Sequence, residues 1–98
     1  MLFFPFRIQG HSMQPTLFPG SIVCVSSIPY FFRSPKFGDI VAFRKENKVF
    51  IKRITKILNN TYFLQGDHTS DSFDSRQFGW IEQKHILGKV IYILRKKM

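Results

Sequence analysis

Short runs of β-branched and aromatic residues, interrupted by residues that favour turns, recur along the whole chain. The runs fall at residues 22–25, 40–43, 49–54, 61–64 and 90–94, and clusters of Gly, Pro, Asn and Ser separate them. Runs of this length and composition, bounded by turn formers, are typical of strands. The pattern therefore predicts an all-β domain, built as a small partly open barrel of bent antiparallel strands.

The connections between these runs are short and polar. Residues 44–48 (RKENK) have the length of a hairpin loop, and Asn59-Asn60 predicts a second turn. Residues 27–36 contain two prolines and three aromatic residues, which indicates a loop or a bent edge. The only helix we expect is a turn or two around residues 82–87.

The length of the chain allows one domain, and we expect residues 1–98 to form it. A hydrophobic content of 44% suffices for an ordinary core without metals or cross-links. Cys24 is the single cysteine, which excludes a disulfide framework and a cysteine zinc site. We expect no cofactor and no metal.

Apolar segments are present but short. No run approaches the roughly 18 to 20 apolar residues that span a bilayer, so no transmembrane helix is expected in this sequence. Leu2–Phe6 lacks a preceding basic region and a small-residue cleavage site, which excludes a signal peptide. It is an edge strand or a lip that touches a membrane. For this stretch and for Tyr30–Phe32 we favour core packing over an exposed lip.

The net charge is +9, from 15 Lys and Arg against 6 Asp and Glu. Such an excess points to an anionic partner, either nucleic acid or an acidic membrane surface, although a solvated basic face explains it as well. One functional hypothesis is therefore a non-catalytic basic β-domain that binds anionic membrane or nucleic acid.

Three segments carry side chains suited to catalysis. In GHSMQPTL at 10–17, the turn can expose the Ser12 hydroxyl and leave backbone N–H groups free for an oxyanion. In FIKRI at 50–54, burial of the strand face that holds Lys52 would lower its pKa and suit a general base. GDHTSDSFDSR at 66–76 suits a tight loop with paired Asp74 and Arg76. Taken singly, each segment also fits a purely structural role.

Together and in this order, the segments resemble the conserved boxes of the type I signal peptidase family, serine endopeptidases with a Ser/Lys dyad. The first three boxes match SMQPTL at 12–17, GDIVAF at 38–43 and IKRI at 51–54. The fourth box matches GD at 66–67, SFDSR at 72–76, Gly79 and GKV at 88–90. Four ordered boxes are a specific signal, whereas any one alone would be weak.

The resemblance implies a role for each matching residue. Ser12 would be the nucleophile of a serine endopeptidase and Lys52 its general base. Ser72 would orient the lysine amine, and the Asp74–Arg76 pair would hold that loop. The backbone N–H of Ser12 would supply part of the oxyanion hole.

The resemblance also implies the kind of substrate. Family members cut after small residues, so the substrate would be an extended polypeptide, a signal peptide or propeptide, with small side chains one and three positions before the cut. It would bind as an added β-strand and react through an acyl-enzyme. Gly10, Met13 and Pro15 are expected to border the oxyanion site and the groove, and Phe50 and Ile54 to add apolar walls. We expect no nucleic acid as a partner. We do expect a peripheral contact with an anionic membrane.

The sequence departs from the family pattern in three places. Gly10 stands where some members place a hydroxyl residue that completes the oxyanion hole, and His68 replaces the usual Asn. After Arg53 the customary Gly-x-Pro-Gly-Asp continuation is missing, and with it the large insertion. With no membrane anchor expected in this sequence, the chain is similar to a minimal soluble member, such as the proteases that trim propeptides of nickel superoxide dismutases, or to a fragment whose anchor is supplied elsewhere. It would be cytoplasmic or peripheral at the membrane.

Three histidines leave a Ser-His-Asp triad as an alternative. His11 adjoins Ser12, and adjacent residues of an extended segment point apart. His68 lies in the loop near the expected site and stays a candidate; His85 is the third histidine. We favour the Ser12–Lys52 dyad.

Overall fold

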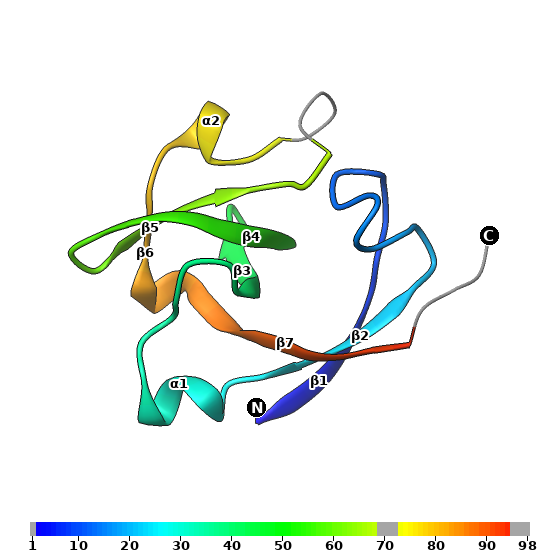
Figure 1. Ribbon diagram of the computed structural model, residues 1–98, viewed down its shortest axis with the longest axis horizontal. Helices are drawn as coiled ribbons and strands as arrows, with labels where there is room; N and C mark the ends of the chain where they lie inside the picture. The colour runs from blue at the N-terminus through cyan, green and yellow to red at the C-terminus, as the bar shows by residue number, and fades with distance from the viewer. Residues whose placement is uncertain (1, 69–72, 95–98) are drawn as a thin grey trace.

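The strands form one antiparallel sheet that is bent but not closed. The computed structural model describes residues 2–68 and 73–94. In this part of the chain the sheet has seven strands in the order β1-β2-β7-β3-β4-β5-β6 (Figure 1). The elements are β1 (Phe3–Arg7), β2 (Ile22–Ser26), α1 (Pro29–Phe32), β3 (Ile40–Lys45), β4 (Lys48–Leu58), β5 (Thr61–Gln65), α2 (Ser75–Phe78), β6 (Ile81–Glu82), the 3₁₀ turn η1 (Gln83–His85) and β7 (Ile86–Leu94). The all-β, partly open fold is confirmed.

Every strand expected from the apolar runs is present, and the hairpins are tighter than expected. Only Glu46 and Asn47 lie between β3 and β4, at φ +52° and +67°. Two consecutive residues with positive φ match the twist of the flanking strands, which makes this a two-residue hairpin turn. Asn59, at φ +57°, begins the equally short connection of β4 to β5.

Close packing of β7 against the end of β2 depends on Gly88. A Cβ at this position would lie 2.6 Å from the backbone oxygen of Ser26. Because real Cβ atoms do not approach so closely, only glycine lets the strands meet here. The contact lies where the pairing of β3 with β7 shifts register between Ala42 and Phe43, so it forms part of the bend in the sheet.

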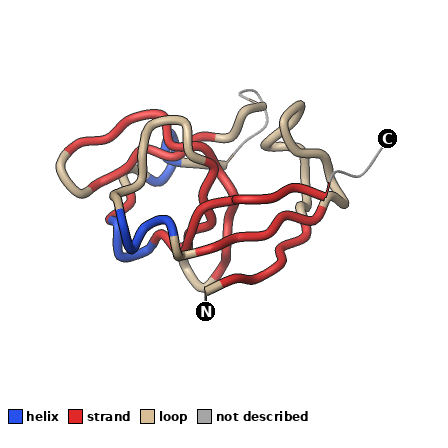
Figure 2. The backbone as a smooth tube through the Cα atoms, turned by 60° about the horizontal axis from the view of Figure 1, so that its bottom comes forward, coloured by secondary structure: helices blue, strands red, loops and turns tan. Residues whose placement is uncertain are grey.

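The bent sheet buries residues on both of its faces, because side chains alternate along each strand. One apolar cluster contains Ile8, Met13, Leu17, Val23, Val25, Ala42, Ile51 and Val90. The other contains Val41, Phe43, Ile54, Tyr62, Leu64 and Ile81. Figure 2 shows the strands crossing one another at steep angles, as expected for a strongly twisted and bent sheet.

Two expectations about local structure need correction. Residues 27–36 contain a short helix, α1, because Pro29 stands at its first turn, where a missing N–H is tolerated. A second helix, α2, was also missed; Asp74 caps it, accepting a hydrogen bond from the backbone of Arg76. The turn expected at 82–87 is η1.

Core packing is wrong for the outward-facing members of the two Phe-rich stretches. Four of these side chains are more than half exposed: Leu2 (51%), Phe3 (51%), Phe31 (65%) and Phe32 (84%). Phe4, Phe6 and Tyr30 pack against the core and are half-buried. On β1 the split follows from alternation, which turns every second residue outward.

In the described part of the chain, no helix is long and apolar enough to cross a membrane.

Candidate active site

Ser12 lies in a compact turn that follows β1. The turn is closed by hydrogen bonds from the backbone N–H of Gln14 to the carbonyl of His11 (3.1 Å) and from Leu17 to Met13 (2.9 Å). The side chains of Met13 and Leu17, 2% and 0% exposed, anchor the turn in the core. Ser12 itself is half-buried, so the core holds the turn while its hydroxyl still borders the groove described below.

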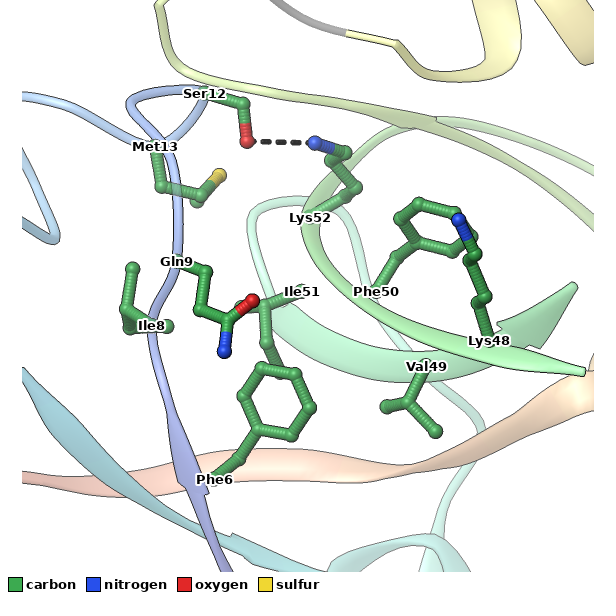
Figure 3. Close-up of a pocket in the computed structure, with 10 residues that line it drawn as sticks. All are labelled: Phe6, Ile8, Gln9, Ser12, Met13, Lys48, Val49, Phe50, Ile51 and Lys52. Carbon is green, nitrogen blue, oxygen red and sulfur yellow. Dashed lines mark hydrogen bonds between the residues drawn. The ribbon is translucent and has the colours of Figure 1, made fainter. Parts of the chain in front are cut away.

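Lys52 approaches Ser12 from the opposite side, on β4. Its side chain is 4% exposed, and Nζ donates a hydrogen bond to Ser12 Oγ at 2.6 Å (Figure 3). The two residues are 40 positions apart in sequence. Lys52 shares its strand face with Phe50 and Ile54, and the structure makes this an inner face.

Burial changes the acidity of the Lys52 amine. Desolvation lowers its pKa from the usual 10.5 because a buried ammonium loses its hydration. The carboxylate of Asp74 acts in the opposite direction, and the guanidinium of Arg76 again lowers the pKa, but burial has the largest effect. The environment therefore shifts the amine toward its neutral form, which can accept a proton.

The loop that faces this pair is organised by Asp74, which is fully buried. Its carboxylate accepts hydrogen bonds from the backbone N–H of Gly66 (2.8 Å) and from Arg76 through Nε (3.0 Å) and Nη2 (2.8 Å). Ser75 extends the anchoring, since its hydroxyl accepts from the backbone N–H of Leu64 at 2.9 Å. Ser72, the residue expected to orient Lys52, lies outside the described residues.

A second carboxylate links three segments, and the sequence analysis missed it. Arg53 donates to Asp67 from Nε and Nη2, both at 2.9 Å, and from Nη1 to the carbonyl of Gly38 at 2.9 Å. Thr16 donates to the same carboxylate at 2.6 Å. These bonds hold the pKa of Asp67 below its usual range, although burial alone would raise it. The motif placed Thr16, Arg53 and Asp67 in conserved boxes, but nothing in their spacing predicted that they meet.

The loop also contacts the nucleophile turn directly. The backbone N–H of His68 donates to the carbonyl of Ser12 at 2.8 Å. Together with the Thr16–Asp67 bond, this contact joins the turn that carries Ser12 to the loop at two points. The two other histidines lie elsewhere: His11 is exposed, and the ring of His85 is 3.9 Å from the carboxylate of Glu82.

A groove of about 230 Å³ opens beside the Ser12–Lys52 pair. Its walls come from the end of β1 and the turn on one side and from the first half of β4 on the other (Figure 3). The lining residues are Phe6, Ile8, Gln9, Ser12, Met13, Lys48, Val49, Phe50, Ile51 and Lys52.

Other residues expected at the groove lie elsewhere. Gly10 and Pro15 are exposed and are not among the lining residues, and Ile54 is buried in the core. Gly10 has φ +76°, a conformation that a residue with a side chain rarely adopts, whereas a Cβ there would meet no neighbour within 4 Å. The glycine therefore meets a backbone requirement of the turn.

The side chains that commonly ligate metal ions are dispersed over the described part of the chain. Across residues 2–68 and 73–94, no group of three or more His, Cys, Asp or Glu side chains is placed to hold a metal ion. The groups that converge on the groove are a hydroxyl and an amine, which suit nucleophilic catalysis.

The chain matches the family described as Signal peptidase, peptidase S26, over residues 1–57 and 54–94. The two matched stretches meet at residues 54–57. This is the place after Arg53 where the continuation usual in such proteins is missing.

Individual relatives are similar over most of this chain. Probable thylakoidal processing peptidase 2, chloroplastic, of Arabidopsis thaliana is 27% identical over 135 aligned positions, covering 90% of this chain and 37% of the relative. Inactive signal peptidase IA of Staphylococcus aureus is 24% identical, covering 85% and 74%. Signal peptidase I of Buchnera aphidicola is 35% identical, covering 64% and 23%. This chain thus spans less than two-fifths of the thylakoidal peptidase.

Proposed function

Because this chain belongs to the signal peptidase family, peptidase S26, we propose that it is a serine endopeptidase with Ser12 as nucleophile and Lys52 as general base. One observation carries the proposal: a buried lysine amine lies 2.6 Å from a serine hydroxyl at the edge of a groove. A nucleophile and a base within hydrogen-bond reach are the signature of an activated serine.

The proposed reaction has two stages, and Lys52 transfers the proton in each. In its neutral form the Lys52 amine takes the Ser12 proton while Oγ attacks the carbonyl carbon of the peptide bond. The ammonium then gives that proton to the departing amine as the C–N bond breaks, which leaves an ester on Ser12. Lys52 next deprotonates a water molecule, which attacks the ester and frees the serine.

The negative oxygen that forms during attack needs hydrogen-bond donors. The backbone N–H of Ser12 is suited to this role, because no residue in the described part of the chain accepts a hydrogen bond from it. Such a preorganised donor stabilises developing charge without reorganisation during the reaction. Gly10 has no side chain to act as a second donor, so that donor comes from backbone or from another segment.

Two free strand edges support binding of the substrate as an added strand. In the described part of the chain β1 pairs only with β2, and residues 48–52 of β4 pair only with β3. The backbone groups of Ile8 bond to Gly20 and Ser21, and those of Ile54 bond to Gly38 and Asp39. Because backbone groups alternate in direction along a strand, those of Gln9 and Ile51 point the other way, toward the groove. An extended peptide can hydrogen-bond to both edges at once.

The substrate class follows from the groove and from the family. Beside the nucleophile the walls include buried Met13 and Ile51, which leave little depth for a large side chain close to the cut. We therefore propose cleavage after small residues, in a signal peptide or propeptide. The relatives named as processing and signal peptidases support this class of reaction.

A second surface bears on where the protein works. Phe31, Phe32 and Phe37 are 65%, 84% and 75% exposed on α1 and the segment after it, next to exposed Lys36. Apolar side chains beside cations, on a chain with net charge +9, suit peripheral contact with an anionic membrane. The turn that carries Ser12 precedes β2 and α1 follows it, so contact through α1 is made at the opposite end of this strand (Figure 1).

Membrane contact can be measured by sedimentation with phosphatidylglycerol vesicles. The double variant Phe31→Ser/Phe32→Ser should lose about tenfold or more in partitioning, while Leu58→Ser, an equally exposed apolar residue elsewhere, should not. Equal binding of the two variants would contradict this surface.

The decisive test of the enzyme is formation of the serine ester. Incubation with peptides that contain Ala-x-Ala should give cleavage after the second Ala and a covalent adduct on Ser12, detected by mass spectrometry. Ser12→Ala should abolish both. One relative is named inactive, so the absence of cleavage and of adduct across a broad peptide library would favour the alternative, a non-catalytic basic domain.

A further inference from the structure

The groove continues beyond the Ser12–Lys52 pair into a second, larger hollow. This hollow has a volume of about 510 Å³ and is lined by Phe4, Phe6, Arg44, Val49 and Leu87. Phe6 and Val49 also line the groove at Ser12. The two spaces therefore share a wall on each side and form one trough between β1 and β4, and we call the part distant from Ser12 the distal trough.

The distal trough is an apolar surface that the fold leaves partly uncovered. Phe4, Phe6, Val49 and Leu87 pack against the core cluster but are only half-buried, so each presents apolar surface to the hollow. Arg44 is exposed and is the single charged residue that lines it among the described residues. The distal trough thus combines an apolar floor with one cation at its rim.

For a peptide that lies parallel to the two strands, their directions indicate which part of it reaches the distal trough. Four successive antiparallel pairings connect β1 through β2, β7 and β3 to β4, so β1 and β4 run in the same direction, toward Ser12 and Lys52. A peptide parallel to both strands has the residues before the cut in the trough. These residues stay bonded to Ser12 in the acyl-enzyme, so a binding surface is most useful on this side.

We propose, on the premise of the protease function above, that the distal trough binds a large apolar side chain of the substrate, about four to six residues before the scissile bond. Phe4 lines the distal trough and Gln9 lines the groove near Ser12. Five residues, or about 16 Å at the rise of a strand, separate the two, and an extended peptide alongside spans the same distance with about five residues. Arg44 would favour an acidic residue beside that side chain.

This assignment gives the enzyme a two-part specificity. A small side chain is required next to the nucleophile, and a Leu, Ile or Phe upstream strengthens binding. An alanine at the upstream position would leave most of the distal trough empty and its apolar floor in contact with water. Peptides that carry only an Ala-x-Ala site are therefore incomplete substrates.

Peptide binding to the Ser12→Ala variant tests this without relying on turnover. A series of fluorescent peptides keeps Ala-x-Ala constant and moves one Leu through positions two to eight before the expected cut, in a Ser background. Fluorescence anisotropy should show about tenfold or tighter binding when Leu is four to six positions upstream. A flat profile, or tighter binding only with Leu after the cut, would overturn the proposal.

Two variants in the same Ser12→Ala background locate the site. Leu87→Ser should remove most of the Leu preference, whereas Leu58→Ser, on the exposed end of β4, should keep it. Arg44→Glu, at an exposed position that leaves folding intact, should change a preference for Asp beside the Leu into one for Lys. Equal profiles for Leu87→Ser and Leu58→Ser, together with an Arg44→Glu variant that keeps the Asp preference, would place the Leu elsewhere.

The unmodified protein separates this proposal from the protease function. If it cleaves all peptides with equal kcat/KM regardless of the Leu, the protease stands and the distal site is refuted. If it cleaves none and forms no ester while Ser12→Ala keeps the Leu profile, the binding trough stands and the protease function fails.

Discussion

Arg53 and Asp67 form a two-point ion pair, in which Nε and Nη2 donate to the two carboxylate oxygens at 2.9 Å each. Arg53 directly follows Lys52 on β4, and Asp67 also accepts from Thr16 in the nucleophile turn. One carboxylate therefore ties the strand of the base to the turn of the nucleophile. We infer that this network sets the distance between the two reacting groups.

Removing the charge of that carboxylate should loosen the site. Asp67→Asn is expected to lower the free energy of unfolding by about 1–3 kcal/mol at pH 7 and to reduce kcat more than it changes KM, because the nucleophile turn loses its alignment. Urea denaturation and peptide kinetics measure the two effects. Glu82→Gln, which affects only exposed contacts, with Lys84 at 3.6 Å and His85 at 3.9 Å, should change stability by less than about 0.5 kcal/mol.

The same substitution should have a characteristic pH dependence. The pKa of Asp67 is lowered in the fold, so its ionised form contributes stability above the unfolded value of 3.8, and this contribution is lost as pH falls through the lower folded pKa. The stability difference between the native protein and Asp67→Asn should therefore be full at pH 6 and shrink below pH 4. A difference that stays constant down to pH 2 would contradict the role of the charge.

Lys52 and His68 can be compared as general bases. Lys52→Ala and Lys52→Arg should each lower kcat/KM at least about a thousandfold, because alanine removes the base and arginine holds its proton. His68→Ala should stay within about tenfold of the native value, since His68 donates to the carbonyl of Ser12 through its backbone N–H, which alanine keeps. The reverse pattern would replace the dyad by a histidine mechanism.

The pH profile of kcat/KM should report the Lys52 amine. Activity should rise with pH as the amine loses its proton, with a midpoint below 10.5 because burial lowers the pKa. Arg76→Gln should move the midpoint to higher pH, since the positive charge of Arg76 helps to lower this pKa. An unchanged midpoint in that variant would show that another group limits the reaction.

Burial of the base should reduce stability at neutral pH. The folded pKa of Lys52 lies below its unfolded value, so below the folded pKa the protein carries the full penalty of a buried ammonium, and this penalty disappears as pH rises toward 10.5. Lys52→Met should therefore be inactive but more stable at pH 6, by about 1 kcal/mol or roughly 4–8 °C in Tm. A Tm below that of the native protein would contradict this reasoning.

The β3–β4 turn offers a change far from the groove. Glu46 has φ +52° without being glycine, a conformation that costs a side-chain-bearing residue about 1 kcal/mol. Glu46→Gly should raise the free energy of unfolding by about 0.5–1 kcal/mol and leave kcat/KM unchanged. Glu82→Gly, at a position with negative φ (−73°), is the matched control and should be neutral or destabilising.

Local features of the fold followed from the sequence. Short runs of β-branched and aromatic residues between turn formers located β2, β3, β4, β5 and β7, because strand preference depends on local composition. The short helices α1 and α2 could not be predicted in this way, since each is a single turn set by Pro29 or Asp74 rather than by a periodic pattern.

The sequence by itself determined five of the seven described strands, the face of β4 that carries Lys52 and the resemblance that joins Lys52 to Ser12. Only the tertiary structure decided that this face is inner, that Lys52 Nζ comes within 2.6 Å of Ser12 Oγ across 40 positions of sequence, and that, among the described residues, β1 and the first half of β4 each keep one edge unpaired. The reason is physical: periodicity and motifs are local, whereas burial, the convergence of Thr16 and Arg53 on Asp67, and the groove depend on the order in which the strands pair.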